Sequence, residues 1–416
     1  MNSTHRATVL GNFGAGEGSP KPGSQETSTA TRTGRDGRWL ADPGLGVYVH
    51  IPFCRHRCHY CDFNTYAKSE HLFAAYVEAL IAEIERSPGS SRPATSVFFG
   101  GGTPTLLTPL QLSRILGAVR SRIGIEPDAE ITIEGNPEGL DEKFFEQLLH
   151  AGFNRFSIGV QSLAPHVLAA LERTHSAETA LRAALAARKA GVTDLNLDLI
   201  YGSPWETERD WRDSVVGVIE AGPDHVSAYA LTVESRTPLG AAVAQGRVPD
   251  VDPDIQADRH HAAEDLLGRS GYRRYEVSNW ARPGHASRHN LLYWSAGNYW
   301  GFGAGAHGHE DGWRYWRIRR PADFIATVRA GGDTVLDSEI VAGDARAAEA
   351  LMLGLRLTDG INLIDWSARF GGRALDRRMS VITELTDLGL LSLEQEYLRV
   401  RPQHTLMLGE VIARLL

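Results

Sequence analysis

Short apolar segments alternate with amphipathic segments along residues 46–231, and this alternation narrows the possible folds more than any other feature. The apolar segments are as long as single strands, whereas the segments between them repeat their apolar residues at helical spacing. Strands that alternate with helices pair in parallel, in a barrel or in an open sheet. Six units are too few for an eight-stranded barrel, so we predict an α/β fold that forms an incomplete (β/α)6 TIM-like barrel with an open side. The expected strands cover residues 46–51, 96–99, 130–133, 155–160, 194–200 and 225–231, and the expected helices cover residues 71–86, 110–123, 142–151, 177–190 and 208–221.

The rest of the chain divides by composition. Residues 1–40 are rich in Gly, Ser, Thr and Arg, with hardly a hydrophobic residue between Phe13 and Trp39, so we predict a disordered tail. We assign residues 41–255 to the partial barrel and residues 256–343 to an aromatic-rich connecting region that completes the core. Residues 344–416 are expected to form a small C-terminal winged-helix-like α+β domain, with helices at 345–355, 363–370 and 374–388 and a hairpin through 397–400.

Charge and hydropathy exclude several classes of function. The net charge of −8 and the pI near 6.1 argue against a general binder of nucleic acid or of membrane surfaces. The C-terminal module shows no concentrated basic patch on its expected wing, so we expect no DNA binding. No apolar run approaches the roughly 18 residues of a membrane span, and the first residues lack the apolar core of a signal peptide. We therefore expect a cytoplasmic protein, with at most peripheral membrane contact, whose thiols stay reduced and can hold metal.

All three cysteines of the chain, Cys54, Cys58 and Cys61, lie in one short loop just past the first expected strand. An odd number of clustered cysteines cannot form a complete set of disulfides. A zinc site would need a fourth ligand, such as His50, His56, His59 or a distant histidine. An iron–sulfur cluster is favoured, because thiolates are its usual ligands and three of them leave one iron open to another ligand.

Unusual residues follow most of the other expected strands, at the ends where chemistry gathers in βα barrels. Glycines 100–102 form a strand-exit turn, which can be purely structural or can let backbone approach a ligand. Glu134 ends a buried strand, where it can cap the next helix or bind a ligand. Gln161 and Asp198 also stand at strand ends, but single polar residues there indicate no function by themselves.

The spacing Cys-x3-Cys-x2-Cys after the first strand, together with Gly-Gly-Thr-Pro after the second, resembles the radical S-adenosylmethionine (SAM) superfamily. The resemblance implies that Cys54, Cys58 and Cys61 bind three irons of a [4Fe-4S] cluster, and that SAM chelates the fourth. In that superfamily an electron donor reduces the cluster, and cleavage of SAM gives a 5′-deoxyadenosyl radical that the protein positions and shields.

Longer motifs narrow the resemblance to the oxygen-independent coproporphyrinogen III oxidases and their relatives, the HemW-type heme chaperones, over roughly residues 45–405. The resemblance implies that Tyr48, Gly101 and Glu134 contact one SAM. In the oxidase, the matching residues that would line a second SAM are Tyr60, Gly102, Thr103, Gln161, Arg173, Asp198 and Ala230. The motifs are Tyr48–Cys54, Phe99–Thr105, Ile133–Glu138, Ser157–Gln161 and Asn196–Gly202.

Two features favour the chaperone over the oxidase. The oxidase carries a further cysteine two positions past the third cluster ligand, where this chain has Phe63. The stretch His289-Asn-Leu-Leu-Tyr-Trp294, followed by residues 299–308 with His307, is similar to a signature of the chaperones. Aromatic residues of this kind can simply pack an interface. They also suit a flat apolar tetrapyrrole, so His289 is a candidate axial ligand of heme iron.

The resemblance thus implies a chaperone that binds heme, a [4Fe-4S] cluster and SAM, and that passes heme to acceptor proteins such as respiratory enzymes. The alternatives are a coproporphyrinogen III oxidase that decarboxylates propionate side chains and, from a different class, a structural zinc protein. We predict no catalytic residue and expect no coproporphyrinogen oxidase activity. The sequence does not decide whether the protein cleaves SAM or whether it forms a homodimer.

Overall fold

The computed structural model describes residues 35–416, so residues 1–34 of the predicted tail lie outside the described residues. Residues 35–40 were wrongly included in that tail, because they pack onto the fold. The Trp39 side chain is 6% exposed and belongs to the core of the C-terminal region. The Arg35 guanidinium forms an ion pair with the Asp194 carboxylate. A buried indole and a few ion pairs, which also join Arg35 to Glu130 and Arg38 to Asp359, fix this segment, and none of these residues alters the polar composition from which the tail was predicted.

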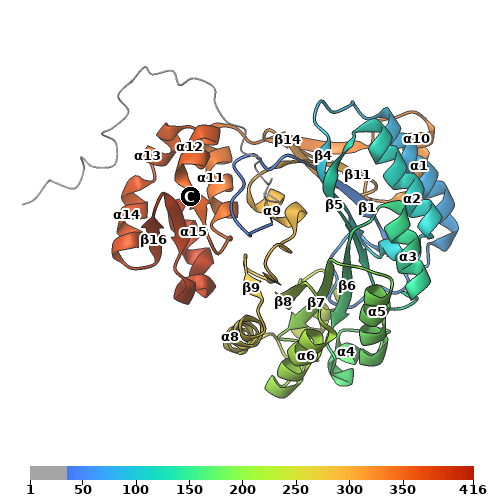
Figure 1. The fold of residues 1–416 in the computed structure, drawn as a ribbon, viewed down its shortest axis with the longest axis horizontal. Helices are drawn as coiled ribbons and strands as arrows, with labels where there is room; N and C mark the ends of the chain where they lie inside the picture. The colour runs from blue at the N-terminus through green and yellow to red at the C-terminus, as the bar shows by residue number, and fades with distance from the viewer. Residues whose placement is uncertain (1–34) are drawn as a thin grey trace, which may run out of the picture. The chain divides into compact units, whose positions relative to one another are not determined.

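Strand–helix units repeat along the first part of the described chain and confirm the predicted alternation. Adjacent strands of these units pair in parallel, and helices cover the outer face of the resulting sheet (Figure 1). The strands are β1 (Leu45–Ile51), β4 (Ala94–Gly101), β5 (Ile125–Gly135), β6 (Arg155–Gln161), β7 (Leu195–Tyr201) and β8 (His225–Ala230). The helices are α1 (Phe73–Arg86), α2 (Pro109–Arg122), α3 (Glu142–Ala151), α4 (Pro165–Ala170), α5 (Ala177–Lys189), α6 (Glu208–Ala221), α7 (Pro238–Ala244) and α8 (Pro253–Arg269).

Local sequence signals set the ends of these helices. The Thr108 hydroxyl and the Gln111 side chain form a capping box at the start of α2, and Thr207 with Asp210 forms another at the start of α6. Gly152, with a φ of +104°, ends α3 in the left-handed conformation that glycine adopts without strain.

A seventh parallel strand, β11 (Asn298–Phe302), pairs with β1 on the side opposite β4, and our strand prediction missed it. Further strands extend both sides of the parallel core in antiparallel fashion, so the 12-stranded sheet ends in two edge strands and stays open. One side carries β12 (His307–Glu310), β13 (Trp313–Arg317) and β14 (Val335–Ile340), and the other carries β10 (Asn279–Ala281) and β9 (Arg273–Arg274). Helices α9 (Arg288–Trp294) and α10 (Pro321–Arg329) lie in the same part of the sequence.

The C-terminal region contains helices beside a three-stranded antiparallel sheet, in the order β15-β17-β16. Its elements are α11 (Gly343–Gly354), β15 (Ile361–Asn362), α12 (Leu363–Phe370), α13 (Gly372–Asp376), α14 (Met379–Asp387), β16 (Leu391–Glu394), β17 (Tyr397–Val400) and α15 (Leu408–Leu415). The single helix expected over residues 374–388 is in fact two, with a break at Arg377 and Arg378. There the Arg378 guanidinium reaches the Asp344 carboxylate at 2.8 Å and the Ala374 carbonyl at 2.8 Å.

Two large apolar clusters hold the described chain together. One lies between the parallel strands and the helices α1–α6 and contains fully buried side chains such as Val47, Phe99 and Trp211. The other joins α9 to the C-terminal elements around Trp366. Between residues 35 and 416, no helix combines the length and the apolarity that crossing a membrane requires.

Candidate functional site

The cysteine loop begins directly after β1 and is clamped at its base. Two short parallel strands, β2 (Phe53–Cys54) and β3 (Tyr66–Ala67), pair with each other and close the loop between them. The Phe53 side chain is fully buried against Phe73 and Tyr76, with ring centroids 4.6 Å and 5.0 Å apart. Within the loop, the Cys61 N–H donates to the Cys58 carbonyl at 3.1 Å. The three cysteines are therefore presented from a fixed base.

Glycine at position 102 lets the cysteine loop approach the end of β4. A Cβ atom added to Gly102 would lie 2.4 Å from the Phe53 carbonyl oxygen. The Gly102 N–H donates to the Ile51 carbonyl at 2.8 Å, and the Thr103 N–H donates to the Phe53 carbonyl at 2.7 Å. The space beside Gly102 is thus filled by the protein's own backbone, which ties the cysteine loop to the second unit.

A cavity of about 630 Å³ opens beside this loop, on the side of the C-terminal strand ends. This volume lies within the roughly 300–1,000 Å³ typical of small-molecule sites. Every residue that the sequence predicted for the site lines this one cavity: Tyr48, Cys54, Cys58, Tyr60, Cys61, Gly101, Gly102, Thr103, Glu134, Gln161, Arg173, Asp198, Ala230 and His289. The structure brings them together from all parts of the barrel, and the ligand of each remains a prediction.

The cysteine sulfur atoms receive weak donors from neighbouring units. The Thr103 hydroxyl donates to the Cys54 Sγ at 3.7 Å, and the Arg173 guanidinium donates to the Cys58 Sγ at 3.6 Å. Burial raises the pKa of the Cys54 thiol to about 11 and also raises that of Cys61. A metal that binds here must therefore displace protons from the thiols.

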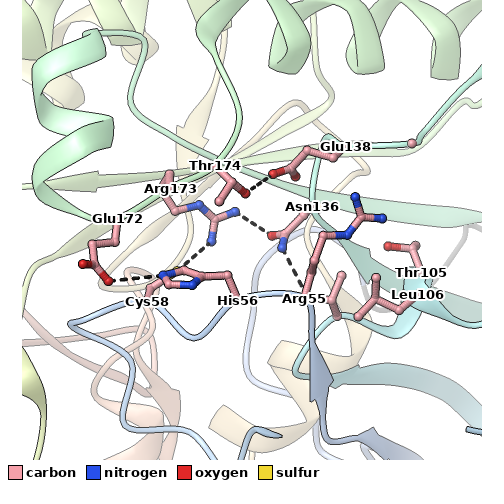
Figure 2. Close-up of a pocket in the computed structure, with 12 residues that line it drawn as sticks. Arg55, His56, Cys58, Thr105, Leu106, Asn136, Glu138, Glu172, Arg173 and Thr174 are labelled. Atoms are coloured by element: carbon pink, nitrogen blue, oxygen red, sulfur yellow. Dashed lines mark hydrogen bonds and ion pairs between the residues drawn. The ribbon is translucent and has the colours of Figure 1, made fainter. Parts of the chain in front are cut away.

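Asn136 holds this arrangement together, and the sequence analysis missed its role. Its Nδ2 donates to the Thr103 hydroxyl at 3.2 Å, and its Oδ1 accepts from the Arg173 guanidinium at 2.6 Å. Figure 2 shows Arg173 between Cys58 and Asn136, at the edge of a smaller cavity of about 180 Å³. The signal in the sequence is the Asn-Pro pair directly after the β5 strand end, inside a motif from which we assigned only Glu134.

Glu134 lies where β5 ends and faces the cavity. Its Oε2 accepts a hydrogen bond from the Gly101 N–H at 3.2 Å. Burial, with a contribution from the charge of Asp198, raises the pKa of the Glu134 carboxyl to about 8. A desolvated carboxyl group with only one backbone donor is suited to form hydrogen bonds with hydroxyl groups of a bound ligand.

Gln161 shows two signs of a ligand-binding residue. Its backbone has a φ of +67°, which is uncommon outside glycine, at an irregularity in the pairing of β6 with β7. Its side-chain Oε1 is buried, and no partner for it exists among residues 35–416. Strained backbone and an unsatisfied buried acceptor both concentrate at binding sites.

A network of polar side chains forms the floor of the cavity below Asp198. The Asp198 carboxylate accepts from Ser157 at 2.8 Å and from Asn196 at 2.7 Å. The Asn196 Oδ1 accepts a hydrogen bond from the His225 Nδ1 at 2.7 Å, and the other ring nitrogen of His225 lies 3.0 Å from the Tyr275 hydroxyl. Burial raises the pKa of Asp198. The sequence analysis identified only Asp198 of this network, and it placed Asp198 at a strand end, whereas the residue lies in the middle of β7.

His289 is placed on the cavity wall but is deeply buried, with 1% of the residue exposed. Its Nδ1 lies 2.8 Å from the Ser96 hydroxyl and its Nε2 lies 2.8 Å from the Tyr293 hydroxyl. The ring stacks on Phe98 with centroids 5.2 Å apart. Burial lowers the pKa of His289 to about 3. Coordination of iron by this ring therefore requires loss of one of these hydrogen bonds.

The three cysteine sulfurs do not form a compact single-ion site within residues 35–416. Zinc holds four ligands at about 2.3 Å, which places its sulfur ligands about 4 Å from one another. Among residues 35–416, one group of potential metal ligands has all its ligand atoms within 4.8 Å of one another. It consists of Asp194, Asp224 and His285, and the cysteines form no such group. Arg155 and Arg188 already pair with the two carboxylates of that acidic group.

Comparison with protein families identifies two modules. Residues 48–215 match the radical SAM superfamily, and residues 341–403 match the HemN C-terminal domain. The structure resembles that of coproporphyrinogen III oxidase (HemN) from Escherichia coli, with a TM-score of 0.77, 22% identity, and coverage of 91% of this chain and 92% of that one. This likeness confirms the predicted fold class.

Similar sequences cover nearly the whole chain. The heme chaperone HemW of Mycobacterium tuberculosis is 40% identical over 377 residues, which are 89% of this chain and 95% of the relative. The heme chaperone HemW of Escherichia coli is 39% identical over 68% of this chain and 76% of its own length. A bovine mitochondrial protein, radical S-adenosyl methionine domain-containing protein 1, is 33% identical over 96% of this chain and 90% of its own length.

Proposed function

Because the chain belongs to the HemW family of radical SAM proteins, we propose that it is a heme chaperone that binds heme and passes it to acceptor proteins. The observation that carries the proposal is the 40% identity to the Mycobacterium tuberculosis heme chaperone across 95% of that relative. The fold alone would not suffice, because the porphyrinogen oxidase of Escherichia coli shares it at 22% identity.

We propose that the cavity at the cysteine loop holds a [4Fe-4S] cluster on Cys54, Cys58 and Cys61. The three thiols in one short loop and the absence of a further cysteine in the chain support this assignment over zinc. Thr103 and Arg173 donate to two of the sulfurs and so orient them. When bound, such a cluster supplies one-electron chemistry and an open iron for a further ligand.

SAM is the proposed ligand of the same cavity. The buried Gln161 Oε1 has no partner in the described chain, and the desolvated Glu134 carboxyl has only the Gly101 N–H. These two groups, on β6 and β5, can accept hydrogen bonds from ribose hydroxyls or amino groups. Tyr48, Gly102 and Asp198 line the same volume, and Tyr60, Thr103, Arg173 and Ala230 complete the predicted set.

The alternative function is oxidative decarboxylation of coproporphyrinogen III. Phe63 stands where the oxidase carries its further cysteine, and its side chain is 65% exposed. We therefore propose no porphyrinogen oxidation. The acceptor is proposed to be a respiratory heme protein, reached in the cytoplasm or at a membrane surface, and an electron donor would serve the cluster. Nucleic acid binding is not part of the proposal, and a homodimer stays open.

Anaerobic reconstitution followed by heme titration tests the proposal. Reconstituted protein should be brown, contain about four irons per chain and bind heme in a saturable manner. Incubation with reductant, SAM and coproporphyrinogen III should give no protoporphyrinogen. Saturable heme binding without product supports the chaperone, product formation supports the oxidase, and a colourless sample with about one zinc per chain supports the structural zinc protein.

A further inference from the structure

His307 begins β12, directly after the turn of residues 303–306 that follows β11. Its side chain is exposed and stacks on Trp316, its cross-strand partner in β13, with centroids 6.1 Å apart and an interplanar angle of 28°. Within residues 35–416, neither ring nitrogen of His307 has a hydrogen-bond partner. The imidazole is thus oriented by stacking while both of its nitrogens stay available.

This availability distinguishes His307 from the other histidines around the cavity and the neighbouring sheet. Hydrogen bonds engage both ring nitrogens in four of them, whereas exposed His56, which also lines the cavity, pairs with Glu172 through its Nε2 at 3.2 Å. The partners are Tyr48 and Asn64 for His50, Asn196 and Tyr275 for His225, Ser96 and Tyr293 for His289, and Gly297 and Gly312 for His309. Metal coordination by any of these rings would break a hydrogen bond, whereas coordination by His307 would break none.

A positive charge lies beside His307. The Arg319 side chain is exposed, has no carboxylate partner in the described part of the chain, and is close enough for its charge to act on His307. Its carbonyl accepts from the Asn64 amide at 3.0 Å and from the Tyr66 hydroxyl at 3.2 Å. Because Asn64 and Tyr66 belong to the segment that closes the cysteine loop, these bonds fix the His307 region beside that loop.

Aromatic side chains with exposed area stand both in the cysteine loop and beside His307. Phe63, next to Asn64, is 65% exposed, and Trp316 is half-buried. A flat apolar ligand with two carboxylates needs apolar contact area, a neutral imidazole for its iron and a cation for its carboxylates. Trp316, His307 and Arg319 supply these three kinds of group side by side.

We propose that His307 is the protein ligand to the iron of the heme cargo, held by Trp316, with Arg319 as the partner of a heme propionate. The inference rests on the proposed chaperone function and replaces His289 as the iron ligand. Burial and the Arg319 charge lower the pKa of His307, so the ring is neutral and its lone pair is free at neutral pH. An exposed ligand on a sheet also suits a cargo that must leave intact, because release requires no opening of the core.

Heme titration of reconstituted protein, followed by the Soret band and by electron paramagnetic resonance of the ferric form, tests the assignment. His307→Ala should shift the Soret maximum and weaken heme binding by about tenfold or more. Added imidazole should restore the wild-type spectrum, which a merely structural defect would not allow. Arg319→Ala should weaken binding and leave the Soret position unchanged. The matched control is His150→Ala, an exposed histidine on the outer helix α3, which should behave as wild type.

The outcomes separate this inference from the chaperone proposal. If wild-type protein binds no heme, the proposed function fails. If wild type binds heme and His307→Ala binds it with the same affinity and spectrum, the His307 assignment alone is overturned. A loss of the spectrum in His289→Ala but not in His307→Ala would return the ligand to His289. Equal iron content and far-UV circular dichroism of each variant show that the fold and the cluster are intact.

Discussion

Replacing Gly102 with alanine tests how the cysteine loop is held against the barrel. The added Cβ would lie 2.4 Å from the Phe53 carbonyl oxygen and 2.9 Å from its carbonyl carbon and amide nitrogen. An ordinary contact requires about 1 Å more. The obstructing atoms are backbone, so no side-chain rotation can relieve the contact. Strand β2, which carries Cys54, must move away from the end of β4.

The magnitude follows from packing and from two hydrogen bonds. Overpacking of a close contact costs about 1–3 kcal/mol. The bonds from the Gly102 N–H to Ile51 and from the Thr103 N–H to Phe53, at 2.8 Å and 2.7 Å, each contribute about 0.5–1.5 kcal/mol and would be weakened. We therefore expect Gly102→Ala to lower the free energy of unfolding by about 2–4 kcal/mol and to reduce the iron bound per chain.

Urea unfolding and iron analysis after anaerobic reconstitution give the two readouts. Gly117→Ala is the matched control, because no atom lies within 4 Å of its added Cβ and Gly117 lies inside helix α2. This control should keep its iron and gain about 0.5–1 kcal/mol of stability. If Gly102→Ala kept the wild-type stability and the wild-type iron content, the account of the loop would be refuted.

Three further predictions concern the cluster, SAM and the ion pairs at the opposite end of the strands. Cys58→Ala should remove bound iron and the visible absorption, and an unaltered iron content would contradict the ligand assignment. Glu134→Gln should weaken SAM binding by about 10- to 100-fold in calorimetry, whereas Glu142→Gln on helix α3 should have no effect. Burial by itself would raise the pKa of Asp194. The Arg155 and Arg35 guanidiniums and His285 outweigh burial and hold the pKa of this residue well below its usual range. Its contribution to stability is therefore present above about pH 4 and is lost as the pH falls further. The difference in urea midpoint between wild type and Asp194→Asn should shrink in acid, and a difference that stays constant from neutral pH down to about pH 3 would contradict this.

Local patterns made the βα units predictable, and a nonlocal pairing did not. Strand β7 alternates leucines with the polar residues Asn196 and Asp198 before it ends in Leu199, Ile200 and Tyr201, and it lies where the sequence predicts a strand. Strand β11 contains Tyr299, Trp300 and Gly301 rather than a β-branched run, and its partner β1 lies some 250 residues earlier in the chain. Nothing in the residues themselves indicates that register.

The site was predictable to the extent that its residues stand at strand ends. Glu134 follows that rule, whereas Asp198 was wrongly placed at a strand end and is the middle residue of β7; the structure brings both into one cavity with the cysteines. Asn136 and Asn196 act through hydrogen bonds to other side chains, which only the assembled fold reveals. His289 shows the limit of motif reasoning, because the motif gives the residue but not the bonds that already engage both of its nitrogens.

Transfer of heme to an acceptor tests the central claim most directly. Reconstituted protein loaded with one equivalent of heme would be mixed with the heme-free form of a respiratory heme enzyme, and the activity gained by that enzyme would be followed over time. A chaperone should lose its Soret absorption as the acceptor gains activity, faster than free heme at the same concentration supplies it. Heme that never binds, or that binds and never reaches the acceptor, would contradict the account.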